Sequence, residues 1–117
     1  MMQKFDMRQI NNFINGNALA TELKATQSSR RAFVVIGPTI SMKFLNTTSI
    51  EQLIFWIRKY EIQKVYIEND WDVSDDELLG SIHIKNIKGI NQLEKRLSTF
   101  LDDFSKLDVE WKTENPL

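Results

Sequence analysis

The sequence predicts an α+β domain with two layers, in which helices cover one face of a roughly five-stranded, largely antiparallel sheet. Short runs of alternating or β-branched residues predict the strands, and apolar residues at helical spacing predict the helices. Turn residues between adjacent runs favour antiparallel connections. The expected order of elements is α(α)-β-β-α-β-β-α-β. Because 117 residues without a linker or repeat suit one core, we expect residues 1–117 to form a single domain.

The N-terminal elements are expected to be helices. Asp6 is a suitable N-cap, because its carboxylate can accept hydrogen bonds from the amides of the first turn. The apolar residues that follow keep helical spacing: Met7, Ile10, Phe13 and Ile14. Asn15-Gly16-Asn17 then favours a turn. A second short helix is predicted over residues 18–26, since it would place Leu19 and Leu23 on one face.

A β-hairpin is predicted on either side of the Gly37-Pro38 break. Residues 31–36 are β-branched or aromatic and apolar on both faces, which favours a central strand. Residues 39–44 alternate between polar and apolar, which favours a strand with one face in water. The inward side chains of that strand would be Ile40, Met42 and Phe44.

The middle of the chain is expected to form a helix over residues 50–60. Thr48-Ser49-Ile50-Glu51 matches a capping box, in which the hydroxyl and the carboxylate each accept from a backbone amide. An apolar stripe at helical spacing follows: Ile50, Leu53, Ile54 and Ile57, with Tyr60 near its end. Phe55 and Trp56 widen this stripe, which indicates a helix buried on more than one side.

Three further strands, over residues 64–68, 81–85 and 108–112, and a helix over residues 90–104 complete the expected fold. Ile82 and Ile84 are expected to face inward, as are Val109 and Trp111. The outward positions of four strands are polar, so one face of the sheet is expected to stay in contact with water. They are Thr39, Ser41, Lys43, Lys64, Tyr66, Glu68, Ser81, His83, Lys85, Glu110 and Lys112.

The composition excludes several kinds of chemistry. The chain has no cysteine, which excludes disulfides, thiolate catalysis and cysteine-ligated zinc. The N-terminal residues lack the apolar run of a signal peptide, and no apolar stretch reaches the roughly 20 residues of a membrane helix. The four glycines do not match the spacing of a phosphate-binding loop. We therefore expect a soluble cytoplasmic protein without a membrane partner, cofactor or metal.

Charge is divided unevenly along the chain. Residues 1–67 have a net charge of +5, and residues 68–117 have a net charge of −6. The acids are densest in residues 68–77, where six of ten side chains are acidic and none is basic. A calcium loop is not expected. An EF-hand that starts at Asp70 would need glycine and glutamate at the positions that Asp75 and Ser81 occupy. Ser74 with Glu77 instead matches a second capping box, which favours a short helical turn.

Trp71 lies in the middle of this acidic segment. A tryptophan among carboxylates suits a protein-binding hot spot, because the indole offers a large contact area and the acids steer a basic partner. The alternative is that Trp71 folds back and covers the edge of the core. We assign partner binding to the acids and the tryptophan of this segment: Glu68, Asp70, Trp71, Asp72, Asp75, Asp76 and Glu77.

Two other functions have weaker support, and no catalytic residue is assigned. A small hydrolase would use His83, the one histidine, and would require a concave pocket around it with a perturbed pKa. Direct nucleic-acid binding is disfavoured by an isoelectric point near 5.8. Its candidate residues are the cations of the basic half, with two rings for stacking: Lys24, Arg30, Arg31, Lys43, Arg58, Lys59, Phe33 and Tyr66.

The expected function is therefore binding rather than catalysis. We expect a non-enzymatic protein-binding module, of inhibitor or immunity type, that neutralises a basic partner such as a toxin or a nuclease through its acidic surface. Small acidic α+β proteins that neutralise toxins share this general profile, which is an analogy at the level of the fold. The opposite charges of the two halves also allow a homodimer.

Overall fold

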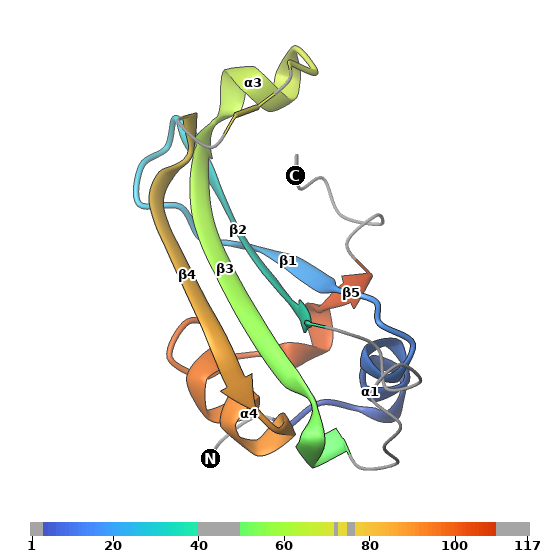
Figure 1. The fold of residues 1–117 in the computed structure, drawn as a ribbon. Coiled ribbons are helices and arrows are strands. Elements are labelled where there is room, and N and C mark those ends of the chain that lie inside the picture. The colour runs from blue at the N-terminus through green and yellow to red at the C-terminus, as the bar shows by residue number, and fades with distance from the viewer. Residues whose placement is uncertain (1–3, 40–49, 72, 75–76, 110–117) are drawn as a thin grey trace.

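The computed structural model describes residues 4–39, 50–71, 73–74 and 77–109. Within these residues, five antiparallel strands form one sheet in the order β4-β3-β2-β1-β5, so the predicted α+β class is confirmed (Figure 1). The elements are α1 (Met7–Ile14), β1 (Leu19–Leu23), β2 (Arg30–Pro38), the 3₁₀ turn η1 (Ile50–Gln52), β3 (Ile54–Gln63), α3 (Lys64–Glu68), β4 (Leu79–Lys88), α4 (Ile90–Leu97), the 3₁₀ turn η3 (Phe104–Lys106) and β5 (Asp108–Val109).

Strands β1 to β4 form a meander, in which each strand pairs with the next one along the chain. β5 then returns to pair with β1, where Leu19 lies opposite Val109. In Figure 1, α1 and α4 lie beside the lower part of the sheet, and α3 lies at its opposite end. α1 and α4 therefore lie at one end of the sheet, and α3 lies at the other.

The sheet has an apolar core on each face. The helix-side core lies between the sheet and the segments that contain α1 and α4: Phe5, Phe13, Leu19, Val34, Ile36, Leu53, Phe55, Ile57, Ile87, Ile90, Leu93, Leu97, Leu101, Phe104, Leu107 and Val109. The α3-side core is smaller and consists of Ala20, Phe33, Val35, Tyr60 and Ile62, with partly buried neighbours that include Tyr66 and Ile67 of α3. α1 and α4 thus cover one face as predicted, but the other face is only partly in contact with water.

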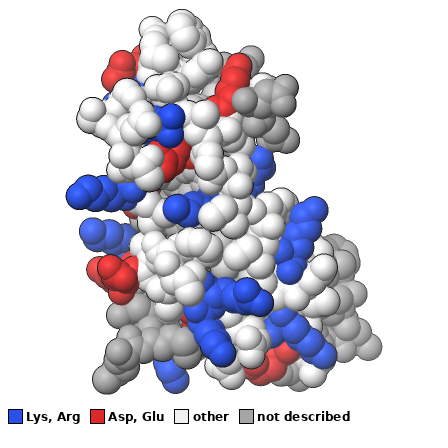
Figure 2. All heavy atoms as spheres, turned by 90° about the vertical axis from the view of Figure 1, so that its left-hand side faces the viewer, with Lys and Arg blue, Asp and Glu red and all other residues white. Residues whose placement is uncertain are grey.

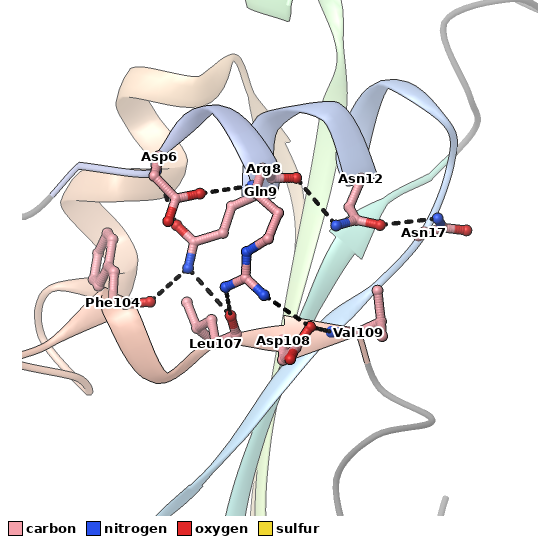
Figure 3. A network of polar contacts seen from close by, with 9 residues as sticks. All are labelled: Asp6, Arg8, Gln9, Asn12, Asn17, Phe104, Leu107, Asp108 and Val109. Atoms are coloured by element: carbon pink, nitrogen blue, oxygen red, sulfur yellow. Dashed lines mark hydrogen bonds and ion pairs between the residues drawn. The ribbon is translucent and has the colours of Figure 1, made fainter.

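The N-terminal helix begins where the sequence predicts. The Asp6 carboxylate accepts from the backbone amide of Gln9 at 2.8 Å, and the Gln9 side chain accepts from the Asp6 amide at 3.0 Å. Gln9 is buried, and its amide nitrogen donates to the carbonyls of Phe104 and Leu107 (Figure 3). Arg8 donates to the same Leu107 carbonyl and lies 3.2 Å from the Asp108 carboxylate. The first turn of α1 is therefore attached to the residues that lead into β5.

The predicted helix over residues 50–60 is wrong, because most of it belongs to β3. Alternate residues of β3 enter different cores, with Phe55 and Ile57 on the helix side and Tyr60 and Ile62 on the α3 side. A strand that is buried on both faces reads as a continuous apolar run, which also satisfies helical spacing. Only the short η1 turn precedes it, and residues 48–49 of the expected capping box lie outside the described residues.

Two other predicted elements have the opposite conformation. The helix expected over 18–26 is the strand β1, because its backbone pairs with β2 on one side and with β5 on the other. The strand expected over 64–68 is the helix α3, which follows directly on β3 and has no buried side chain. Long-range pairing decides the first case, and local propensity does not reveal it.

The C-terminal half follows its prediction more closely. β4 contains the predicted strand 81–85, but Ile82 is 39% exposed while Ile84 is partly buried against the helix-side core. α4 ends at Leu97, so the predicted helix over 90–104 is too long. The predicted break at Gly37-Pro38 is wrong, because both residues belong to β2 and pair with Trp56 and Phe55 of β3. Residues 40–44 of the predicted hairpin and 110–112 of the last strand lie outside the described residues. No described helix has the length and apolar character that crossing a membrane requires.

Candidate functional site

The acidic segment lies at the α3 end of the molecule. We call its described residues, 64–71, 73–74 and 77–78, the α3 tip. Trp71 is 54% exposed and Val65 is 43% exposed, so both present apolar surface to water. The Trp71 ring packs edge-on against Tyr66, with centroids 5.6 Å apart and an interplanar angle of 80°. Trp71 is therefore held in place by Tyr66 without being covered.

The backbone turns sharply after α3. Asp70 has a left-handed φ of 52°, and the Trp71 amide donates to the Tyr66 carbonyl at 2.9 Å. The Asn69 side chain donates to the Val65 carbonyl at 2.9 Å, which satisfies a group at the end of the helix. This turn returns the chain over α3 and places Trp71 beside Tyr66. The Asn69 side chain and this turn therefore end a helix of only five residues.

The structure places four of the seven predicted partner-binding residues. Glu68 and Asp70 are exposed, and so is Trp71, while Glu77 is half-buried. The Glu77 carboxylate accepts from the Ser74 amide at 3.0 Å, as the predicted capping box requires. Asp72, Asp75 and Asp76 lie outside the described residues. Among the described residues, no group of three potential ligands is close enough to hold a metal ion.

A second candidate site, of which the sequence-based predictions singled out only His83 and Arg58, is a cleft on the α3-side face of the sheet. We call it the sheet cleft. It has a volume of about 520 Å³ and is lined by residues of β2, β3 and β4 together with the residue that follows β2: Val35, Thr39, Trp56, Arg58, His83, Lys85 and Asn86. Figure 2 views the molecule from the side on which β4 lies. Lys and Arg side chains are spread over that side, with Asp and Glu side chains between them.

Strand pairing brings the polar residues of the sheet cleft together. Arg58 of β3 lies directly opposite His83 of β4, and Trp56 and Lys85 lie two positions further along their own strands. The Trp56 and His83 rings meet edge-to-face, with centroids 6.4 Å apart and an angle of 83°. A Cβ on Gly37 would lie 3.1 Å from the Trp56 ring, so the indole covers this glycine closely. Trp56 therefore forms one fixed wall of the cleft.

The electrostatics of the sheet cleft favour an anion. Partial burial lowers the pKa of His83 below its ordinary value, and the charges of Lys85 and Arg58 lower it further. The imidazole is therefore mostly neutral at neutral pH. No described residue that lines the cleft is acidic. Its described lining can donate many hydrogen bonds and carries positive charge.

Among the described cations proposed for nucleic-acid binding, Arg58 and Lys59 lie on opposite faces of the sheet. Arg30 lies 3.9 Å from the Glu61 carboxylate, and Arg31 forms a 2.7 Å ion pair with Glu22. Phe33 is fully buried, so its ring is not available for stacking on bases. Neighbouring residues of a strand face opposite sides, which separates Arg58 from Lys59. Lys43 lies outside the described residues.

The sheet cleft was missed because its pattern depends on the strand β3. Trp56 and Arg58 alternate on one face of β3, and His83 and Lys85 alternate on the same face of β4. If residues 50–60 are expected to be helical, the sequence does not indicate that Trp56 and Arg58 lie beside His83 and Lys85. His83, on which the hydrolase alternative depends, is an exposed residue of the cleft lining.

Comparisons of this chain with protein-family models, with curated proteins and with solved structures found no match.

Proposed function

We propose that this domain is a non-enzymatic protein-binding module, of inhibitor or immunity type, that engages a basic partner through the α3 tip. The observation that carries the proposal is the exposure of Trp71, which has 54% of its surface in water although Tyr66 holds its ring in place. An ordered, exposed tryptophan offers a large apolar area with little conformational entropy left to lose, as interface hot spots do.

The surroundings of Trp71 support a protein partner. Val65 adds exposed apolar surface on the same short segment, and none of the side chains of α3 is buried. Tyr66 and Ile67 pack partly against the α3-side core, whereas Val65 and Trp71 belong to neither described core. The exposed Glu68 and Asp70 provide a charged rim, which would accelerate association with a basic surface and exclude acidic ones.

Capture experiments from the native host test the proposal. Immobilised wild type is expected to retain a basic protein that Trp71→Ala/Asp70→Lys loses. Ile82→Ala is the matched control, because Ile82 is an exposed apolar residue on β4, outside the α3 tip, and its loss should leave capture unchanged. Equal recovery of the same partner by the wild type and the double variant would reject the α3 tip as the binding site.

A small hydrolase that uses His83 is the second candidate. It is supported by the location of His83 in the sheet cleft and by its lowered pKa, which leaves the imidazole able to accept a proton. Chromogenic carboxylic and phosphoric esters serve as probes, with His83→Gln as the variant. Turnover by the wild type that the variant lacks would support this candidate, and equal rates would exclude it.

A further inference from the structure

We propose that the sheet cleft binds a nucleotide unit, with the phosphate held by Arg58, Lys85 and Asn86 and the base placed against Trp56. This proposal concerns a different surface from the α3 tip and does not depend on the function proposed for that tip. Its volume of about 520 Å³ falls within the range of about 300–1,000 Å³ that small-molecule pockets occupy.

The donors of the sheet cleft suit a phosphate. Arg58 presents a planar guanidinium, which pairs with two oxygens at once, and Lys85 presents a point charge. The Asn86 amide and the His83 ring add neutral donors from the neighbouring strand. Arg58 and Lys85 carry two positive charges, whereas a carboxylate carries one negative charge. A phosphate, with three terminal oxygens and nearly two negative charges, matches them better.

An irregularity in β4 brings two consecutive residues into the sheet cleft. Phe55 pairs with Ile87 and Ile57 pairs with Ile84, so β4 has one more residue than β3 over this stretch. Asn86 has a left-handed φ of 60° at this bulge. Consecutive residues of a regular strand face opposite sides, but here both Lys85 and Asn86 line the cleft. Bulges of this kind frequently re-aim side chains at binding sites.

Trp56 provides the surface for the base. Its indole is held between His83, which meets it edge-to-face, and Gly37, which it covers. Stacking of a base on an aromatic ring is worth about 1–3 kcal/mol and does not require a particular base. A ligand that joins a phosphate to a planar ring would therefore use both parts of the cleft. Neither inorganic phosphate nor a nucleoside does so.

Titration of isotope-labelled protein with adenosine 5′-monophosphate, followed by amide chemical shifts, tests the proposal. Saturable shifts are expected at residues 56–58 and 83–86. Arg58→Gln and Lys85→Gln should each weaken binding by about tenfold, as expected for a lost charged hydrogen bond. Lys59→Gln is the matched control, because Lys59 stands next to Arg58 but lies over the Phe100 ring, and it should bind as the wild type does. Saturable shifts confined to other residues, or none, would overturn the proposal.

Three further ligands define which parts of the nucleotide are recognised. Adenosine and inorganic phosphate should each bind at least tenfold more weakly than the mononucleotide, since each uses one part of the cleft. Equal affinity for adenosine would overturn the assignment of the phosphate. A short single-stranded oligonucleotide that shifts the same amides with higher affinity would support the proposal and identify the nucleotide as part of a nucleic acid. The wild-type shift map tests the proposal even if a variant fails to fold.

Discussion

Trp56 and His83 lie on neighbouring strands with their ring centroids 6.4 Å apart and their planes nearly perpendicular. This contact joins the aromatic wall of the sheet cleft to its one group that titrates near neutral pH. Among the described residues that line the cleft, Arg58 of β3 and Lys85 of β4 are the charged ones beside His83, and both disfavour its protonation. Any anion in the cleft would change that balance.

Anion binding to the sheet cleft should strengthen as the pH falls. In the free protein the pKa of His83 is lowered, first by burial and then by Lys85 and Arg58. A bound anion favours the imidazolium, so it raises this pKa and binding takes up a proton. Sulfate is a suitable probe because its charge is constant over this range. Calorimetry from about pH 8 to about pH 5 should show affinity rising as the pH falls through and below the ordinary histidine pKa of about 6.5, because the pKa of the free imidazole is lowered.

The control for this pH dependence is His83→Gln, which keeps a donor but does not titrate. Its sulfate affinity should change less with pH than that of the wild type. Identical pH profiles for the two proteins would show that another group is responsible.

Loss of the Glu94 side chain should destabilise the fold. Glu94 is only 5% exposed, and its carboxylate accepts from the Phe5 amide at 2.9 Å. Glu94→Ala leaves that buried amide without a partner, at a cost of about 1–3 kcal/mol, and Glu94→Gln should lose less because it retains an acceptor. Urea denaturation measures the difference. Lys95→Ala, on the exposed side of the same helix, should change the free energy of unfolding by less than about 0.5 kcal/mol.

Gln9 should contribute more to stability than the other amide side chains of α1. Its side chain donates to the Phe104 carbonyl at 2.6 Å and to the Leu107 carbonyl at 3.2 Å, and it is buried. Gln9→Ala should therefore lower the free energy of unfolding by about 1–3 kcal/mol. Asn12→Ala removes an exposed bond to the Arg8 carbonyl and a part-buried bond from the Asn17 side chain, and it should cost less than Gln9→Ala because neither bond is fully buried. Similar losses in the two variants would contradict this assignment.

Alanine at Gly37 and alanine at Gly80 should have different effects on the sheet cleft. At Gly37 a Cβ would approach both Trp56 and Ala18 at 3.1 Å, so Gly37→Ala should displace the indole and change the near-ultraviolet circular dichroism. Gly80 has a left-handed φ of 56°, and a Cβ there would meet no atom within 4 Å. Gly80→Ala should cost about 1 kcal/mol through backbone strain, with the tryptophan signal unchanged. An unchanged spectrum for Gly37→Ala would show that Trp56 does not form a fixed wall.

Elements specified by adjacent residues were predictable from the sequence, whereas elements specified by distant pairing were not. The Asp6 cap and the strand around Phe33 follow from local chemistry, and both are present. Residues 54–63 carry apolar side chains on every side, a pattern that a buried helix and a doubly buried strand share. Only their pairing with β2 and β4 decides between the two.

The candidate sites follow the same division. The α3 tip is contiguous in sequence, so its acids and Trp71 could be recognised, although its helical conformation was not expected. The sheet cleft requires Arg58 to lie opposite His83. This register cannot be inferred while residues 50–60 are expected to be helical. The expected water-exposed face was correct for His83 and Lys85, which are exposed.

The attachment of α1 to the residues before β5 has a consequence for how the chain folds during synthesis. Arg8 and its Leu107 acceptor are 99 positions apart, so α1 emerges from the ribosome long before its partners do. Strands β1 to β4 can pair in the order of their synthesis, but Phe13 has no η3 or β5 segment to dock beside until the last described residues are made. Phe13 can pack edge-on against Phe55 as soon as β3 is made. The late step is therefore the polar attachment of α1 to Leu107 and Asp108, and the apolar surface beside Phe13 stays incomplete until then.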